Sequence, residues 1–282
     1  MKKYIILFYL VITINAQDSL SVKEDTSEFW NSKNITYIAT GGGVALTLIS
    51  AYTLYWNTKP SSFHFSDENW FTVPYSWGMD KVGHFYVANI EYHMLKNIMY
   101  MGGHSKEHSM WWAASLTAFL AMAIELGDGF TKWGFDYQDI VFNLGGLGFG
   151  LLQDSYPFVN NFKIKFSFWP ERNDDNKDFL DEFRRYDGYT WWLTMDIANI
   201  FPNSIGKIWP DFIQPAIGFS VFDRARKREF AFGLDFKLET LFGYEEPSWN
   251  IFSKAVEMLH LPAPGIKYSP YYEPKYQLLL LN

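Results

Sequence analysis

The stretch Phe162-Lys163-Ile164-Lys165-Phe166-Ser167-Phe168 marks the point at which the chain changes its hydrophobic period. Apolar and polar residues alternate strictly here, which is typical of a β-strand with one apolar face. The same alternation returns at 230–238, and we expect its face of large apolar side chains to be covered. Weaker alternation predicts three further strands, at 189–200, 216–222 and 276–281.

Upstream of this point, apolar residues fill longer runs that predict four helices, at 35–56, 80–101, 110–126 and 137–152. The first run has 22 residues and no charge, which is enough to span ~30 Å of hydrocarbon. Gly102-Gly103 ends the second run, and Gly146 and Gly150 have the spacing that lets two helix backbones approach closely.

Together these patterns predict an α+β fold. A bundle of about four largely apolar helices forms a membrane-associated domain at 35–157. An antiparallel β-rich region follows at 158–282 and contains two further helices, near 177–185 and 248–259.

The chain begins with two lysines, an apolar run and a small residue at Ala16, the pattern of a secretory signal peptide at 1–16. A polar segment, 17–34, follows it. Cleavage after Ala16 removes Lys2 and Lys3 and no acid, which leaves 22 basic and 31 acidic residues and a net charge of −9. Such a balance disfavours a nucleic-acid partner, because phosphate binding depends on clustered Lys and Arg.

The composition limits the chemistry further. The chain has no Cys, so we expect no disulfide, no thiolate metal site, no cysteine nucleophile and no lipid attached through an N-terminal cysteine. Aromatic residues make up 20% of the chain, with 12 Trp and 18 Tyr. That content fits a membrane interface and fits a large aromatic core under a sheet equally well.

Ionisable side chains lie at the ends of the apolar runs. Residues three or four apart share a helix face, which pairs Asp80 with His84, Glu125 with Asp128, and Asp139 with Asn143. If the predicted helices 80–101, 110–126 and 137–152 are antiparallel neighbours, these pairs meet at one end of the bundle. The sequence therefore predicts a polar site there.

Three kinds of chemistry suit such a site. Lys81 or His84 can neutralise the acids in a purely structural lock. A divalent metal ion, the one candidate cofactor, could be held by carboxylates and an imidazole, from Asp80, His84, Glu125, Asp128, Asp136 and Asp139. General acid–base catalysis could use His84, Glu125, Asp128 and Asp139.

The motifs at these positions are Asp-Lys-x-Gly-His-Phe, Glu-x-x-Asp-Gly-Phe and Asp-x-x-x-Asn-x-x-Gly. They resemble the YfiM-like family of predicted periplasmic lipoproteins and, more distantly, the VanZ-like membrane proteins. The resemblance extends from about residue 70 to the end, through Tyr186-Asp187-Gly188 and Leu261-Pro262-Ala263-Pro264. It carries over Asp80, Lys81, His84, Glu125, Asp128, Asp139 and Asn143, with Asp136 and Glu91 as further members of the pattern.

The resemblance implies an exported cell-envelope protein with periplasmic exposure, in the inner or the outer membrane. Membrane lipid and other envelope proteins are then the candidate partners. The polar cluster would be structural or would bind an ion or a lipid head group. The alternative is a metal-dependent membrane hydrolase or transferase acting on a lipid-linked or phosphate-bearing substrate. No catalytic motif that the chain carries favours that alternative.

His104 and His108 have a spacing that metal ligands use, but they fall between two predicted helices. We expect them in an exposed, solvated turn.

Overall fold

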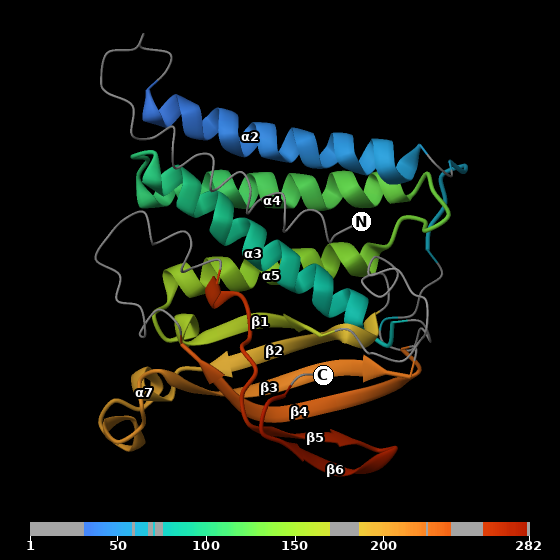
Figure 1. Ribbon diagram of the computed structural model, residues 1–282. Coiled ribbons are helices and arrows are strands. Elements are labelled where there is room, and N and C mark those ends of the chain that lie inside the picture. Colours follow the sequence, from blue (N-terminus) through green and yellow to red (C-terminus); the bar gives the residue numbers. More distant parts are fainter. Residues whose placement is uncertain are drawn as a thin grey trace. The chain divides into compact units, whose positions relative to one another are not determined.

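The computed structural model describes residues 31–57, 60–66, 70, 76–169, 186–223, 225–237 and 256–280 (Figure 1). The predicted signal peptide, 1–16, and the helical stretch 177–185 lie outside these residues. Of the polar segment 17–34 only the last four residues are described, and of the stretch 248–259 only 256–259.

The predicted α+β class is confirmed, since helices precede a six-stranded antiparallel sheet. The chain divides into two compact units. A helical unit comprises Met1–Glu68 and His84–Leu151, and a sheet unit comprises Asn69–Gly83 and Leu152–Asn282. The division falls inside helix α3, whose first turn groups with the sheet unit.

The long helices are α2 (Ser32–Ala51), α3 (Met79–Met101), α4 (Lys106–Asp128) and α5 (Tyr137–Ser155). A π-helical segment, η2 (Tyr52–Trp56), prolongs α2. The predicted second helix matches α3 to within one residue, and Gly103 follows it with φ of +87°, a conformation that glycine adopts without strain.

Capping residues move two helix starts upstream of their predicted positions. Asn31 accepts a hydrogen bond from the Asn34 amide, so α2 begins at Ser32 and not at residue 35. Ser105 caps α4 in the same way, by accepting from the His108 amide, so α4 begins at Lys106 and not at residue 110.

Small residues let helices in the helical unit approach closely. Asn89 of α3 donates a hydrogen bond to the carbonyl oxygen of Gly146 in α5. A Cβ atom on Gly146 would lie 2.0 Å from the carbonyl oxygen of Phe85, and one on Gly150 would lie 2.5 Å from the ring of Tyr92. The predicted backbone approach is therefore confirmed at Gly146, whereas Gly150 makes room for side chains of α3.

Helices α2 and α4 run side by side in the same unit (Figure 1). Val44 of α2 packs in one cluster with Leu120 and Ile124 of α4. Farther along the pair, Trp112 donates its indole N–H to the Thr40 hydroxyl at 3.0 Å. Apolar packing and a satisfied indole thus join the two helices.

The sheet is a meander in which each strand pairs with the next, in the order β1-β2-β3-β4-β5-β6. The strands are β1 (Phe162–Phe168), β2 (Tyr189–Met195), β3 (Ile213–Phe222), β4 (Lys227–Phe236), β5 (Gly265–Ser269) and β6 (Tyr272–Gln277). Short helical segments accompany them: η3 (Val159–Asn161), η4 (Tyr186–Gly188), α7 (Ile197–Ile200) and η5 (Ile205–Lys207).

Strand β1 has the predicted bounds, and β3 and β4 each begin three residues before the predicted strands at 216–222 and 230–238. Two further predictions need a larger correction, and one strand is additional. The strand predicted at 189–200 ends at Met195, because Asp196 accepts from the Asn199 amide and caps α7. The strand predicted at 276–281 lies earlier, at Tyr272–Gln277. Strand β5 was not predicted at all, since it has five residues, with Gly265 and Lys267 among them, and lacks clear alternation.

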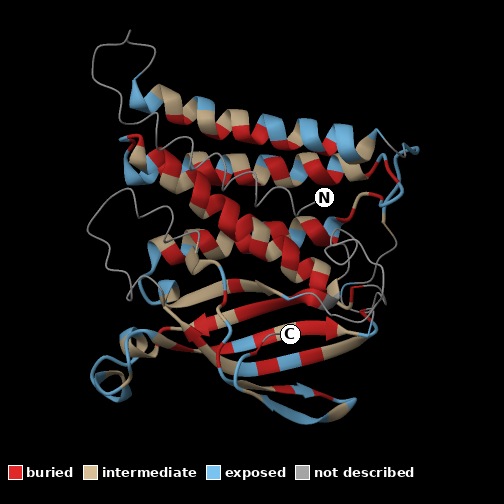
Figure 2. Ribbon diagram, viewed as in Figure 1, coloured by how far each residue is buried: buried red, intermediate tan, exposed pale blue. Residues whose placement is uncertain are grey.

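The apolar face of β4 is only partly covered by the described residues. Phe232 is 50% exposed, whereas the intervening Asp235 is 0% exposed and Glu229 is also buried. Figure 2 shows buried and exposed positions alternating along β3 and β4. The sheet buries its charged face there and leaves aromatic side chains in contact with solvent.

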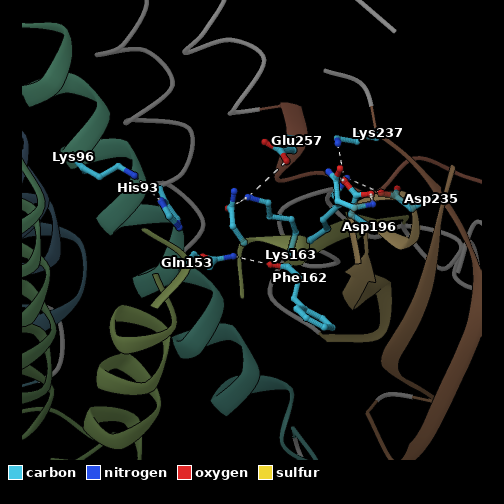
Figure 3. A network of polar contacts seen from close by, with 12 residues as sticks. His93, Lys96, Gln153, Phe162, Lys163, Asp196, Asp235, Lys237 and Glu257 are labelled. Carbon is cyan, nitrogen blue, oxygen red and sulfur yellow. Dashed lines mark hydrogen bonds and ion pairs between the residues drawn. The ribbon is translucent and has the colours of Figure 1, made fainter. Parts of the chain in front are cut away.

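Pairing among the charges offsets the cost of that burial. Lys165 reaches from β1 to Asp235 on β4, with 2.6 Å between Nζ and Oδ2, and His260 Nδ1 lies 2.9 Å from the other oxygen of Asp235. The His260 ring stacks on Trp192, 3.8 Å between centroids. Figure 3 shows this region, where Lys237 also pairs with Asp196 at 2.7 Å.

A second buried group of charges lies on the same face. Lys267 of β5 and Ser220 of β3 both donate to Glu229, at 2.8 and 3.0 Å, and Tyr272 donates to its other oxygen. Burial, together with this bond to Glu229, raises the pKa of Tyr272. Each buried carboxylate on this face therefore has both oxygens in contact with a donor.

We predict that Gly146→Ala destabilises the protein by about 1–3 kcal/mol, because the new methyl group meets backbone that cannot rotate away. Gly148 is the control, since a Cβ there meets nothing within 4 Å. Gly148→Ala should stabilise helix α5 by up to about 1 kcal/mol through helix propensity. Thermal unfolding of the purified variants measures both effects, and equal melting temperatures would contradict the packing assignment.

We also predict that Asp235 makes the protein acid-sensitive. Burial by itself raises the pKa of Asp235, but the bond with His260 and the charge of Lys165 outweigh it and hold that pKa below its usual value. A carboxyl whose folded pKa is depressed stabilises the fold above the unfolded pKa of about 3.9, and this stability is lost as the pH falls through the folded pKa.

Melting curves between about pH 7 and about pH 3 should therefore show a drop below about pH 4. Asp235→Asn should cost about 3–5 kcal/mol at neutral pH, because it leaves Lys165 buried without a counter-charge, and its melting temperature should depend less on pH. The exposed Asp211 offers a matched Asp→Asn control that should change neither value.

Candidate functional site

The first turn of α3 is anchored within the sheet unit. Trp191 on β2 donates its indole N–H to the Met79 carbonyl at 3.1 Å. The Trp191 ring also packs against Gly83, where a side chain would be crowded because its Cβ would lie only 3.3 Å from the ring. Tyr186 donates to Asp80 Oδ1 at 2.9 Å, and Lys81 Nζ lies 3.4 Å from Oδ2. Asp80 and the buried Lys81 thus form a supported ion pair at the start of the helix.

Helix α3 continues from this turn to His84, where three side chains meet the imidazole ring. Asp139 Oδ2 lies 2.8 Å from His84 Nε2, and Asn143 Oδ1 lies 3.1 Å from Nδ1. Glu125 Oε1 lies 3.9 Å from Nδ1. We call these four residues, His84, Glu125, Asp139 and Asn143, the His84 cluster.

Local structure explains how the cluster forms. Glu125 lies in the last turn of α4, and Asp139 and Asn143 lie one turn apart at the start of α5, so both helices present a polar end to His84. A carboxylate in the first turn of α5 is favoured by the helix dipole. All four side chains are buried.

Both ring nitrogens of His84 have polar partners, Asp139 at Nε2 and Asn143 at Nδ1. A protonated ring donates to both, and a neutral ring donates to Asp139 and accepts from the Asn143 amide group when that amide presents its NH2.

Asp80 belongs to the same helix face as His84. The two residues are one turn apart on α3, and their metal-ligating atoms lie within 4.8 Å of each other. His84 and Asp139 are also within that distance, so an imidazole nitrogen and carboxylate oxygens of the kind that bind divalent cations are close together.

The structure places the remaining sequence candidates elsewhere. Asp128 accepts a hydrogen bond from the Trp56 indole at 2.8 Å, and the ring of Trp56 lies where Gly127 has no side chain. Asp136 accepts from the Gln138 amide at 2.8 Å and caps α5. Glu91 is buried two turns beyond His84 on α3, roughly 10 Å along the helix.

Sequence reasoning missed the aromatic partners of the acids. Trp56 is 72 residues from Asp128 and Tyr186 is 106 residues from Asp80, so no local spacing reveals these contacts. The only signal available is the general need of a buried indole N–H or phenol for an acceptor.

The expectation of an exposed turn at His104 and His108 holds only in part, since His108 is exposed but lies in the first turn of α4. His104 is buried, with Nε2 3.2 Å from the Thr36 hydroxyl, and its ring stacks on His108 with 5.0 Å between centroids. His108 Nε2 lies 2.6 Å from the Tyr37 hydroxyl. Within the described residues this pair acts as a contact between α2 and the start of α4.

Comparison with known protein families gives one match that covers the site. A family model described as predicted periplasmic lipoprotein, DUF2279, matches residues 67–155, a range that contains the whole His84 cluster together with Asp80 and Lys81. This similarity supports an exported protein of the cell envelope that is exposed to the periplasm. Neither the curated proteins nor the solved structures gave a match.

Two helical segments among the described residues, Ser32–Trp56 and Lys106–Asp128, are long and apolar enough to cross a membrane by length and composition.

We predict that Asn143→Leu destabilises the protein by about 1–3 kcal/mol, because it removes the acceptor that faces His84 Nδ1 and keeps the side chain's size. Asn143→Asp is the matched control, since it retains an oxygen at the same position and should keep more of the stability. Melting temperatures at neutral pH compare the two variants. If the Asn143→Leu variant unfolds no earlier than the native chain, Asn143 does not support the imidazole.

Proposed function

We propose that this chain is an exported envelope membrane protein whose His84 cluster, together with Asp80, binds a divalent cation. The observation that carries the proposal is the environment of one imidazole, which has Asp139 and Glu125 around it and Asp80 one turn away on its own helix. The motifs that resemble those of the YfiM-like family and, more distantly, of VanZ-like proteins lie at these same positions.

The charges support a cation as the ligand. Asp80, Glu125 and Asp139 contribute three carboxylates, while Lys81 and His84 contribute at most two positive charges. A divalent ion could replace the protons of the imidazolium and bind the neutral ring along with carboxylate oxygens. Because binding releases protons in this arrangement, the affinity should rise with pH.

The helical surfaces support the membrane placement. Only 33% of the apolar window in Ser32–Trp56 and 39% of that in Lys106–Asp128 is buried, whereas the core helix of a water-soluble protein is mostly buried. Large apolar side chains remain exposed along both helices, including Leu46 and Ile49 on α2 and Phe119 and Met122 on α4. Lipid is the solvent that would favour such surfaces.

A second candidate function is a metal-dependent hydrolase or transferase acting on a lipid-linked or phosphate-bearing envelope substrate. The 2.8 Å contact between Asp139 and His84 favours it, because a carboxylate that orients an imidazole is also the arrangement of a general acid–base pair. The two functions share the cation site and differ in whether bound substrate is turned over.

The test is thermal unfolding of chelator-treated protein with Mn²⁺, Zn²⁺ or Mg²⁺ added. A site occupied at about 100 times its Kd should stabilise the native chain by about 2.7 kcal/mol, and His84→Ala, Glu125→Gln and Asp139→Asn should abolish that gain. Asp136→Asn, which alters an acid outside the cluster, should keep it.

The structural lock gives a different result. In that case each cluster variant loses about 3–5 kcal/mol, because its former partner stays buried and unpaired, and no metal changes the melting temperature of the native chain. That outcome would end the cation proposal. Turnover of a phosphate-bearing lipid that depends on both His84 and the metal would establish the second candidate function.

A further inference from the structure

The face of the sheet opposite the buried ion pairs carries an unbroken apolar row. Strand register places Leu193 of β2 opposite Ile217 of β3, Ile217 opposite Phe232 of β4, Phe232 opposite Ile266 of β5, and Ile266 opposite Tyr276 of β6. Exposure grows toward the last strand: Ile217 is 40% exposed, Phe232 50% and Tyr276 81%.

A groove of about 620 Å³ opens along the end of this row. Its apolar lining includes Phe232, Leu234, Pro264, Ile266, Tyr276 and Leu278. A volume of this size suits a hydrocarbon chain, and the polar side-chain groups of the lining are limited to Gln277 and the Tyr276 hydroxyl.

We propose that this face of the sheet unit, from Ile217 to Tyr276 with the groove at its end, docks on the lipid bilayer and receives acyl chains. The inference adds a second membrane contact to the one proposed for the helices, and it does not depend on the cation site. Its first support is that the sheet buries ion pairs on its other face, so the exposed aromatic residues here are not a consequence of a missing core.

The chemistry around the row favours a bilayer over another protein chain. Tyrosines lie on the same face: Tyr268, which pairs with Phe230, is 46% exposed, and Tyr276 is 81% exposed. Tyrosine, with an apolar ring and a polar hydroxyl, suits the boundary between lipid tails and head groups.

The edge of the sheet argues against a second copy that would extend it. Strand β6 exposes Glu273, Pro274 and Lys275, and charges together with a proline at an edge strand block backbone pairing with another strand. The apolar side chains of the row are therefore accessible on the face of the sheet, whereas the edge strand β6 disfavours pairing with a further strand.

The test uses the absence of native cysteine. The full chain is reconstituted into vesicles with Tyr276→Cys or Lys275→Cys, each labelled with an environment-sensitive fluorophore. These neighbours on β6 point to opposite faces, so Lys275→Cys is the matched control. Lipids brominated on their acyl chains should quench the label at 276 several-fold more than the label at 275.

Equal quenching at 275 and 276 would overturn the proposal, and so would a disulfide between two chains carrying Tyr276→Cys, because that result assigns the face to a second copy. A label at Leu46→Cys on α2 reports the helices separately. If bromolipid quenches the label at 46 but not that at 276, the membrane placement of the helices stands and the sheet docking fails; the reverse pattern supports the docking and removes the helical placement.

Discussion

Charge taken out of water must be neutralised by charge or by hydrogen bonds, and that constraint organises both units of this protein. In the helical unit the buried imidazole of His84 has oxygen atoms at both nitrogens. In the sheet unit Lys165 is 1% exposed and reaches Asp235, which is itself 0% exposed. The desolvation cost of an unpaired ion in such a place is several kcal/mol, a large share of the stability of an ordinary domain.

This constraint also explains why strand β4 buries its charged side chains and leaves large apolar side chains exposed. Phe230 and Phe232 are 37% and 50% exposed, so each would gain about 1 kcal/mol from the rest of its burial, and leaving them exposed is costly in water. The charged face cannot be exchanged for the apolar one by a simple slip, because moving a strand by one residue would separate Lys165 from Asp235 and Lys267 from Glu229. Ion pairing fixes the register, and the aromatic residues on the opposite face are left exposed.

Sequence reasoning succeeded where a local signal exists and failed where contacts are distant along the chain. Period-two alternation predicted the bounds of β1. The His84 cluster was predicted from polar residues at the ends of consecutive helices, because antiparallel neighbours bring those ends together. Glu125 and Asp128, by contrast, are three residues apart and share a helix face, so spacing alone cannot separate them. What separates them is Trp56, which holds Asp128 from 72 residues away. Similarly, alternation predicts an outward Lys165, and only Asp235, 70 residues later, makes its inward position stable.

Helix α3 carries Asp80 and His84 of the candidate site. Its first turn is held by Trp191 and Tyr186, and its second turn carries His84. Asp80 is therefore shared: one oxygen accepts from Tyr186, and the carboxylate lies on the same helix face as the imidazole. A cation bound by Asp80, His84 and Asp139 would displace Lys81 from the Asp80 carboxylate and would replace the proton between Asp139 and the ring nitrogen. Ion pairing and cation binding are thus alternative occupations of the same oxygen and nitrogen atoms, and the proton concentration decides between them because only the neutral imidazole can be a ligand.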